Sequence, residues 1–285
     1  MSFSDVYFQK GHSHLVCEDY GMATAFESPQ GHLALAVVSD GCSSSPMTDW
    51  GSRFLCQATR VTGDFEDGKS IIEKARSYQE SLELPIQCLD ATLLIAHETP
   101  DGDGQVFAYG DGAVTARRRD GTGYDSWVMS FDNSAPAYLS YLLNRGRWRD
   151  YKNYGVSQTV RHSPASAGGD FEEYKASAVP GDPFHLTFCR RTYDLVMVFS
   201  DGVESFQKSD GSPIPVADVL DYLVDLKVPR AGGVKRRVRS FLRKHCVTEG
   251  WSHYDDLGVG GVFLDPPPED TKGVVTCDLK PEGTS

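Results

Sequence analysis

A short sequence with an acidic residue occurs twice in this chain of 285 residues. Residues 37–41 read Val-Val-Ser-Asp-Gly, residues 198–202 read Val-Phe-Ser-Asp-Gly, and each copy ends an apolar run, 33–38 or 195–199. Such runs are typical of buried strands, and a glycine after the acid permits a tight turn at the strand end. The repeat therefore predicts two strands that each present one carboxylate, Asp40 or Asp201, at their end.

Further acidic residues flank other predicted strands. The run 105–109 precedes Gly110-Asp111-Gly112, the pair Asp255-Asp256 precedes the run 257–264, and the pair Glu18-Asp19 follows the first predicted strand. Any one of these taken alone is better explained as a solvated turn residue, because Asp-Gly is a common turn dipeptide. Gathered together, carboxylates need a counter-charge, and hard divalent cations prefer oxygen ligands. The set therefore predicts a metal site.

The order of predicted elements indicates one α+β domain. Strands are predicted at 6–10, 21–27, 32–38, 91–96, 105–109, 113–118, 124–131, 184–189, 193–199 and 258–264, and helices at 48–61, 70–82, 135–147, 216–226 and 233–245. Runs of hairpins followed by helices favour α+β layering over the alternation of a parallel sheet. Residues 151–183 are polar and are predicted to form a long loop.

Composition and charge argue against several classes of protein. No run approaches the roughly 18 apolar residues of a membrane helix, and the first residues lack the basic flank and apolar stretch of a secretory signal. Seven scattered cysteines without a C-x-x-C sequence favour reduced thiols in the cytoplasm. A net charge of −12 argues against a nucleic-acid partner. The basic segment 235–244 has apolar residues at helical spacing, which favours an amphipathic helix with a solvated face.

In their order along the chain, these acidic positions resemble the metal-dependent protein phosphatases of the 2C type. The resemblance runs from about Phe8 to Leu264, and residues 130–191 carry little of it. It implies a four-layer αββα sandwich, in which two antiparallel sheets are flanked by helix pairs. It also implies a catalytic domain at 1–265, with a flap or loop insertion at 145–191 and a flexible tail at 266–285.

The resemblance further implies a site for two Mg²⁺ or Mn²⁺ ions. Asp40 would bridge the two ions, with the carbonyl of Gly41 beside it as a further oxygen ligand. Asp201 and Asp255 would complete the first ion's ligands. An all-oxygen site of this kind suits either metal.

Three more acids complete the implied ligand set. Glu18 or Asp19 would hold the second ion, directly or through water. Asp111 matches the position that, together with Asp201, holds a third and weaker metal in many members.

Four positions depart from the family pattern. His14 stands where members usually carry an arginine that grips the substrate phosphate, and imidazole lacks the fork and the permanent charge of guanidinium. Cys42 stands where some eukaryotic members have a histidine. The usual Gly-Ser-Thr is Asp90-Ala91-Thr92, and the closing Asp-Asn is Asp255-Asp256, so either of these last two acids could be the ligand.

The implied activity is hydrolysis of phosphoserine and phosphothreonine in proteins by direct attack of a metal-bridging hydroxide. His14, Asp40 and Asp201 are the predicted catalytic residues, and the predicted partner is a phosphorylated protein, the target of a cognate serine/threonine kinase, with the phosphatase itself a monomer. Two alternatives remain. One is a weakly active or inactive phosphatase-like binding or regulatory module, and the other is a small-molecule phosphate-ester hydrolase with residues 145–191 as a lid.

Overall fold

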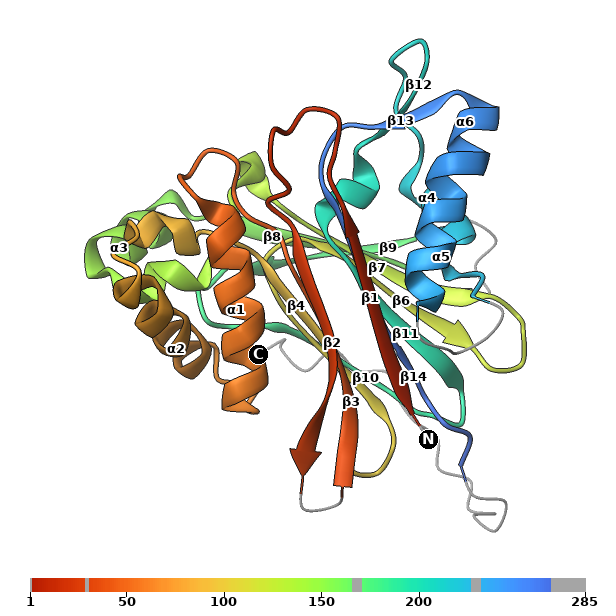
Figure 1. The fold of residues 1–285 in the computed structure, drawn as a ribbon, viewed down its shortest axis with the longest axis horizontal. Coiled ribbons are helices and arrows are strands. Elements are labelled where there is room, and N and C mark those ends of the chain that lie inside the picture. The colour runs from red at the N-terminus through yellow and green to blue at the C-terminus, as the bar shows by residue number, and fades with distance from the viewer. Residues whose placement is uncertain (1, 29–30, 166–170, 227–231, 268–285) are drawn as a thin grey trace.

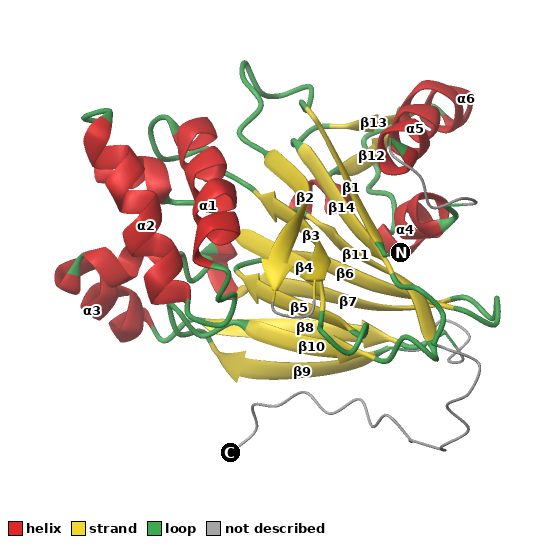
Figure 2. Ribbon diagram, turned by 60° about the horizontal axis from the view of Figure 1, so that its bottom comes forward, coloured by secondary structure: helices red, strands yellow, loops and turns green. Residues whose placement is uncertain are grey.

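Two antiparallel sheets pack face to face, and helices cover the outer face of each sheet (Figures 1 and 2). The structure is a computed structural model that describes residues 2–28, 31–165, 171–226 and 232–267. The arrangement confirms the four-layer αββα sandwich expected from the sequence.

The larger sheet has seven strands in the order β1-β14-β11-β6-β7-β8-β9. In that order they are Phe3–Gln9, Leu257–Phe263, Tyr193–Phe199, Gly112–Arg118, Tyr124–Phe131, Ser157–Ser163 and Glu172–Ser177. The smaller sheet has the order β10-β5-β4-β3-β2, formed by Phe184–Phe188, Gly104–Tyr109, Leu93–Glu98, Gly31–Ser39 and Tyr20–Ser28. A short ribbon pairs β12 (Phe206–Lys208) with β13 (Trp251–His253).

Side chains that alternate along each strand fill separate core layers. In β3, Ala36 and Val38 face the other sheet, whereas Leu35 and Val37 pack under the helices, and all four are fully buried. In β11, Val198 likewise faces the layer between the sheets. Successive strand residues point to opposite faces, and burying one such Val or Leu side chain contributes about 1.5–3 kcal/mol. The doubly buried strands therefore hold their ends rigidly.

Helices from two parts of the chain form the outer layers. The smaller sheet is covered by α1 (Thr48–Thr62) and α2 (Gly68–Ser81), with the 3-10 turn η1 (Ile86–Leu89) beside them. The larger sheet is covered by α4 (Val216–Val224), α5 (Gly233–Ser240), the π-helical turn η5 (Phe241–His245) and α6 (Cys246–Glu249). Asp67 caps α2, because its side chain accepts hydrogen bonds from the backbone amides of Lys69 and Ser70.

The segment between β7 and β10 differs from its prediction. The 3-10 turn η2 (Asp132–Ser134) follows β7. The helix predicted at 135–147 is replaced by the 3-10 turn η3 (Leu139–Leu143), and α3 (Arg145–Tyr154) begins only where Asn144 caps it. The predicted loop at 151–183 contains β8 and β9, which extend the larger sheet beyond β7. β9 is the edge strand and β8 lies between it and β7, and few side chains of either strand are buried, so both lack the apolar signal of core strands.

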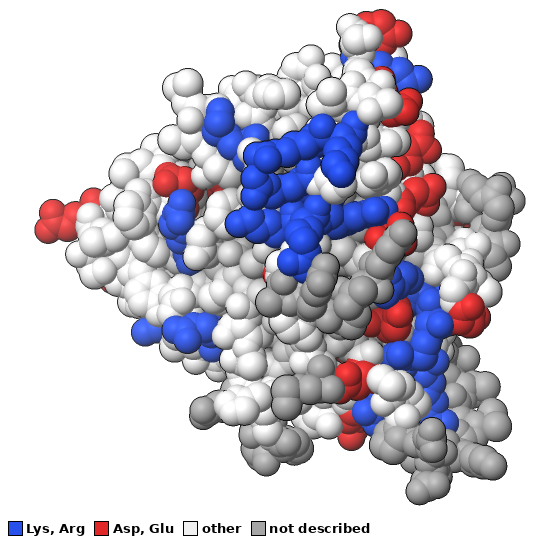
Figure 3. Space-filling view, turned by 45° about the vertical axis from the view of Figure 1, so that its right-hand side comes forward, with Lys and Arg blue, Asp and Glu red and all other residues white. Residues whose placement is uncertain are grey.

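The basic segment after residue 232 forms the expected amphipathic helix. Val238 and Phe241 are buried against the larger sheet, whereas Lys235, Arg243 and Lys244 are exposed and contribute to a basic face of the molecule (Figure 3). In the described part of the chain, no helix has the length and apolar character needed to cross a membrane. Residues 268–285, most of the predicted tail, lie outside the described residues.

Candidate active site

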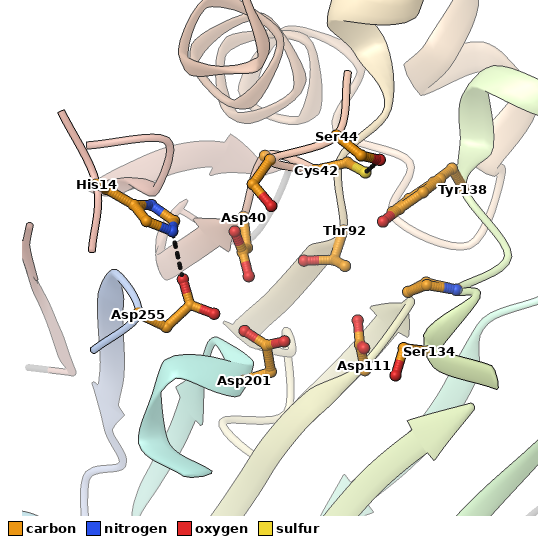
Figure 4. Close-up of a pocket in the computed structure, with 13 residues that line it drawn as sticks. His14, Asp40, Cys42, Ser44, Thr92, Asp111, Ser134, Tyr138, Asp201 and Asp255 are labelled. Atoms are coloured by element: carbon orange, nitrogen blue, oxygen red, sulfur yellow. Dashed lines mark hydrogen bonds and ion pairs between the residues drawn. The ribbon is translucent and has the colours of Figure 1, made fainter. Parts of the chain in front are cut away.

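The two Ser-Asp-Gly sequences end strands of different sheets at the same end of the sandwich. Asp40 follows β3, and Asp201 follows β11 and begins the 3-10 turn η4 (Asp201–Glu204). Asp111 lies in the turn between β5 and β6. The side chains of these three acids converge on one cavity (Figure 4). Sequence positions far apart are thus brought together by the packing of the two sheets.

The serine of each repeat fixes the strand end below the acid. Ser39 donates a hydrogen bond to the carbonyl of Thr92 at 2.6 Å, and Ser200 donates to Oδ2 of Asp19 at 2.7 Å. The amide of Gly258 in turn donates to Ser200 Oγ at 2.8 Å. Both serines are fully buried. A buried hydroxyl with its partners in place locks neighbouring strands together, so the repeated serine has a structural role.

The cavity has a volume of about 210 Å³ and is mainly polar. It is lined by His14, Asp40, Gly41, Cys42, Ser43, Ser44, Thr92, Asp111, Ser134, Pro136, Tyr138, Asp201 and Asp255 (Figure 4). Six of the sequence-predicted site residues belong to this lining, and Glu18 and Asp19 do not. An adjoining cavity of about 290 Å³ shares Asp111, Asp201 and Asp255 with it.

Asp255 and Asp256 have different environments although they are adjacent in sequence. Asp255 lines the cavity, and its side chain is 40% exposed. Asp256 is 1% exposed, and its carboxylate accepts hydrogen bonds from the amides of Gly11 at 2.7 Å and Glu18 at 2.5 Å. Asp256 therefore ties the loop before β2 to the loop before β14, and Asp255 is the acid that faces the cavity.

Glu18 and Asp19 also point in different directions. Glu18 Oε1 accepts a hydrogen bond from Thr48 Oγ1 at 3.1 Å. Asp19 is fully enclosed behind the cavity, and its carboxyl group lies within hydrogen-bonding reach of Asp40. Asp19 is therefore the member of this pair that adjoins the other buried acids.

His14 is surrounded by carboxylates. Its Nδ1 lies 3.1 Å from Asp256 Oδ2 and 3.5 Å from Glu18 Oε2, and its Nε2 lies 3.3 Å from Asp255 Oδ1. Burial alone would lower the pKa of His14, but the close carboxylate of Asp256 and the charges of Asp255 and Glu18 outweigh it and raise the pKa. Both ring nitrogens thus face acidic side chains at the rim of the cavity.

The cluster concentrates negative charge at the end of the sandwich, with Asp19 buried and Asp40, Asp111 and Asp201 half-buried. Burial and the neighbouring charge of Asp201 raise the pKa of Asp111 to about 8. Burial likewise raises the pKa of Asp19 to about 7, although its hydrogen bonds with Asp40 and Ser200 oppose the rise. The pKa of Asp40 is raised by burial and by the charges of Asp19 and Asp201. Carboxylates in such a cluster cannot all be ionised without a nearby cation.

The donor atoms fit a divalent cation. Oδ1 of Asp19 and Oδ1 of Asp201 are buried without a hydrogen-bond partner in the described part of the chain, and buried polar atoms normally have partners. All the acidic donors are oxygens, the ligands preferred by Mg²⁺ and Mn²⁺. Within the described ranges, no group of three or more His, Cys, Asp or Glu side chains is already arranged to hold one ion. A cation would have to draw these groups together.

Several cavity residues were not predicted from the sequence. Glu204 lines the adjoining cavity, and its position three residues after Asp201, within one turn, was a usable signal. Ser134, Pro136 and Tyr138 form the opposite wall. They carry no sequence signal, because only the tertiary packing of the segment after β7 brings them to the site.

Comparisons with known proteins concern both family and fold. A protein-family profile described as Protein phosphatase 2C matches residues 9–243. No curated protein matches the sequence. A solved bacterial serine phosphatase with a single substitution aligns with a TM-score of 0.53 and 12% identity, over 93% of this chain and 98% of that chain. Another structure of a bacterial serine phosphatase aligns with a TM-score of 0.51, at the same identity and coverage. At this identity the structural likeness establishes a shared fold.

Proposed function

Since the chain belongs to the protein phosphatase 2C family, we propose that it is a Mg²⁺- or Mn²⁺-dependent phosphatase that acts on phosphoserine and phosphothreonine of proteins. The observation that best supports this proposal is the buried cluster of carboxylates around one polar cavity, with partnerless oxygens on Asp19 and Asp201. Such a cluster is costly without cations, and a pair of cations would make it a site for phosphate-ester hydrolysis.

We assign the first cation to Asp40, the carbonyl of Gly41, Asp201 and Asp255, all of which line the cavity. The absence of a side chain at Gly41 supports this assignment. A Cβ there would lie 2.7 Å from Cβ of Thr48, so a larger residue would push the backbone out of place. Asp255 is preferred to Asp256 because Asp256 already accepts two backbone amides.

We assign the second cation to Asp40 and Asp19, directly or through water. Asp19 is preferred to Glu18 because its carboxyl group adjoins Asp40 and its Oδ1 has no hydrogen-bond partner among the described residues, whereas Glu18 contacts Thr48 and His14. Asp111 together with Asp201 is the proposed place of a third, weaker ion.

When bound, the cations supply the activation of water and the charge stabilisation that the hydrolysis requires. The chain supplies a fixed backbone at the two strand ends. Asp40 and Asp201 follow fully buried strands of different sheets, and Ser39 and Ser200 lock those strand ends. Only the ligand side chains would then have to close on the cations. The substrate phosphate would enter the cavity between these acids and the wall that contains Tyr138.

The proposal is tested by hydrolysis of p-nitrophenyl phosphate with Mg²⁺ or Mn²⁺. We expect turnover that a chelator abolishes. Asp40→Asn and Asp201→Asn should each lower kcat/KM at least about 100-fold, since even changes outside the direct ligands of a metal cost about 10–100-fold. Neither variant should lose stability without metal, because each removes a charge from a repulsive cluster. Folded wild-type protein that shows no turnover with either metal would contradict the proposal.

A second candidate function is a phosphatase-like binding module with weak or absent turnover. The observation that favours it is the environment of His14, whose two ring nitrogens face acidic side chains. A residue held in this way is a poor clamp for phosphate. Titration calorimetry separates the two candidates, because the enzyme requires at least two bound cations per chain, whereas an inactive module should bind fewer.

The proposed substrate is a phosphorylated protein, the target of a cognate serine/threonine kinase. The cytoplasmic location and the monomeric state expected from the sequence remain predictions.

A further inference from the structure

A buried ion pair connects the back of the cavity to the segment that forms its opposite wall. Asp90 is 2% exposed. The guanidinium of Arg147 in α3 donates from Nη1 to Asp90 Oδ1 at 3.0 Å and from Nη2 to Oδ2 at 2.8 Å. This two-pronged geometry is the strongest form of a charge-assisted hydrogen bond between side chains.

Two hydroxyls complete the environment of the Asp90 carboxylate. Ser140 in η3 donates to Oδ1 at 2.5 Å, and Ser45, in the loop after Asp40, donates to Oδ2 at 2.8 Å. Each carboxylate oxygen therefore accepts two hydrogen bonds. A buried charge with all its acceptor sites occupied holds its partners in one arrangement, and removal of one partner is strongly destabilising.

The backbone of Asp90 is itself part of the site. Its carbonyl accepts a hydrogen bond from the amide of Cys42 at 2.8 Å, and the amide of Thr92 donates to the carbonyl of Asp40 at 2.8 Å. Residues 40–42 and 90–92 are thus bound together directly behind the cavity. The side chain of Asp90 connects this fixed backbone to the segment that carries Arg147.

That segment forms the wall of the cavity. Ser134, Pro136 and Tyr138 line it. Ser134 and Tyr138 lie on the side away from His14 and Asp255, with Asp111 beside Ser134 (Figure 4). Arg147 lies over the ring of Tyr141 at 4.7 Å from its centroid, which adds a cation–π contact to the ion pair. Leu139 is buried in the core under the smaller sheet, and Leu142 and Leu143 pack against it. These apolar side chains anchor η3, whereas the hydrogen bonds of Asp90 with Ser140 and Arg147 are the polar tie between this segment and residues 90–92.

We propose that Asp90 and Arg147 are positioning residues that set substrate selectivity by holding the 134–144 wall in place. The inference rests on the proposed phosphatase function. A phosphopeptide must fit its residues beside the phosphoamino acid between this wall and the carboxylates. A small aryl phosphate needs only the carboxylate side of the cavity. Loosening the wall should therefore weaken binding of the peptide far more than binding of the small ester.

The test compares Arg147→Met with wild type on a phosphothreonine peptide and on p-nitrophenyl phosphate. We expect kcat/KM for the peptide to fall about tenfold, mainly through a higher KM. We expect kcat/KM for the small ester to change less than about threefold, since a misplaced wall lowers the rate only for a substrate that contacts it. Backbone amide exchange should rise in residues 134–144 and stay unchanged in β3 and β11. Arg149→Met is the matched control, because Arg149 lies in the same helix, its side chain is 72% exposed, and its ion pair is with the neighbouring Asp150 at 3.6 Å.

Further variants keep the test decisive if Arg147→Met folds poorly. Arg147→Lys keeps the positive charge but cannot donate to both oxygens of Asp90. It should show a smaller difference between the losses in kcat/KM for the peptide and for the small ester. Asp90→Asn combined with Arg147→Met leaves no unpaired buried charge and should fold while still losing selectivity.

Three results would overturn the inference: equal losses on both substrates, no loss on either, or unchanged exchange in residues 134–144. Should the wild type hydrolyse neither ester, the proposed function and the selectivity would fail together. The exchange measurement would then still decide whether the ion pair positions the wall.

Discussion

Adjacent acidic residues in this protein have different roles because their side chains leave the backbone in different directions. Asp255 faces the cavity, whereas Asp256 is buried and accepts two backbone amides. Asp19 adjoins Asp40, whereas Glu18 accepts a hydrogen bond from Thr48. In each of these acidic dipeptides, one side chain therefore stabilises the loop by hydrogen bonds and the other is placed to bind a cation.

A buried histidine outside the site gives a prediction about pH. His97 in β4 packs against the rings of Phe65 at 4.7 Å and Phe107 at 5.9 Å, and its Nδ1 lies 2.9 Å from the carbonyl of Glu98. Burial lowers the pKa of His97 to about 4, the hydrogen bond opposes this, and the nearby His185 adds to it. The folded protein thus keeps His97 neutral at a pH where the unfolded chain, with its ordinary pKa near 6.5, takes up a proton.

The sign of the effect follows from this difference. The stability contributed by neutral His97 is fully present above about pH 6.5 and is lost as the pH falls toward 4, by up to about 3 kcal/mol. We expect urea unfolding at several pH values to show that His97→Phe loses less stability than wild type over this range. Parallel pH profiles of the two proteins would contradict the prediction. Both proteins contain the same acidic residues, so the titration of those residues cancels when one pH profile of the unfolding free energy is subtracted from the other.

At the scale of secondary-structure elements, close packing of α1 on the η1 turn supports the backbone behind the site. A Cβ built on Gly51 would lie 1.7 Å from the carbonyl oxygen of Cys88, two residues before Asp90. Only glycine allows the helix to approach this closely. The packing of a helix outside the site therefore determines where residues 90–92 lie.

This contact predicts an unusual response to substitution. Alanine normally stabilises a helix interior relative to glycine by about 1 kcal/mol. Gly51→Ala should instead lower the free energy of unfolding by about 1–3 kcal/mol, because the added methyl group overpacks the contact. Gly146→Ala in α3 is the control, since its Cβ would meet only Asn144 Oδ1, at 3.2 Å. Denaturant unfolding of both variants checks this, and a gain in stability for Gly51→Ala would refute the close approach.

At the scale of the whole molecule, the carboxylate cluster couples the two sheets to cation binding. Asp40 follows β3 of the smaller sheet, whereas Asp201 follows β11 and Asp255 precedes β14 of the larger one. Like charges that face each other across the sandwich oppose its closure, and a cation bound between them would favour it. Ligand binding to the folded state alone stabilises it according to the ratio of ligand concentration to Kd.

We therefore expect added Mn²⁺ to raise the thermal unfolding midpoint in a concentration-dependent way. At 100 times Kd the gain in stability should be about 2.7 kcal/mol. Asp40→Asn should lose most of this shift, whereas Asp120→Asn, at an exposed turn acid, should keep it. An unchanged midpoint at millimolar Mn²⁺ in calorimetric scans of the wild type would argue against any cation site between the sheets.

The sequence alone was sufficient to predict the layers and the family. Apolar runs such as 33–38 and 195–199 are local signals, and the spacing of the acids along the sequence does not depend on packing. The family and the sandwich that they predicted are both confirmed. The strands β8 and β9, the last two of the larger sheet, were missed because a strand with little buried surface leaves no apolar pattern.

Only the tertiary structure decided which member of each acidic pair lies with the carboxylates of the site, and which segment forms the far wall of the cavity. The direction of a side chain in a loop depends on contacts from distant parts of the chain, as for Asp256 with the amides of Gly11 and Glu18. The tie between Asp90 and Arg147 joins residues 57 positions apart. No local pattern encodes such a pair, because it exists only after the sheets and helices have packed.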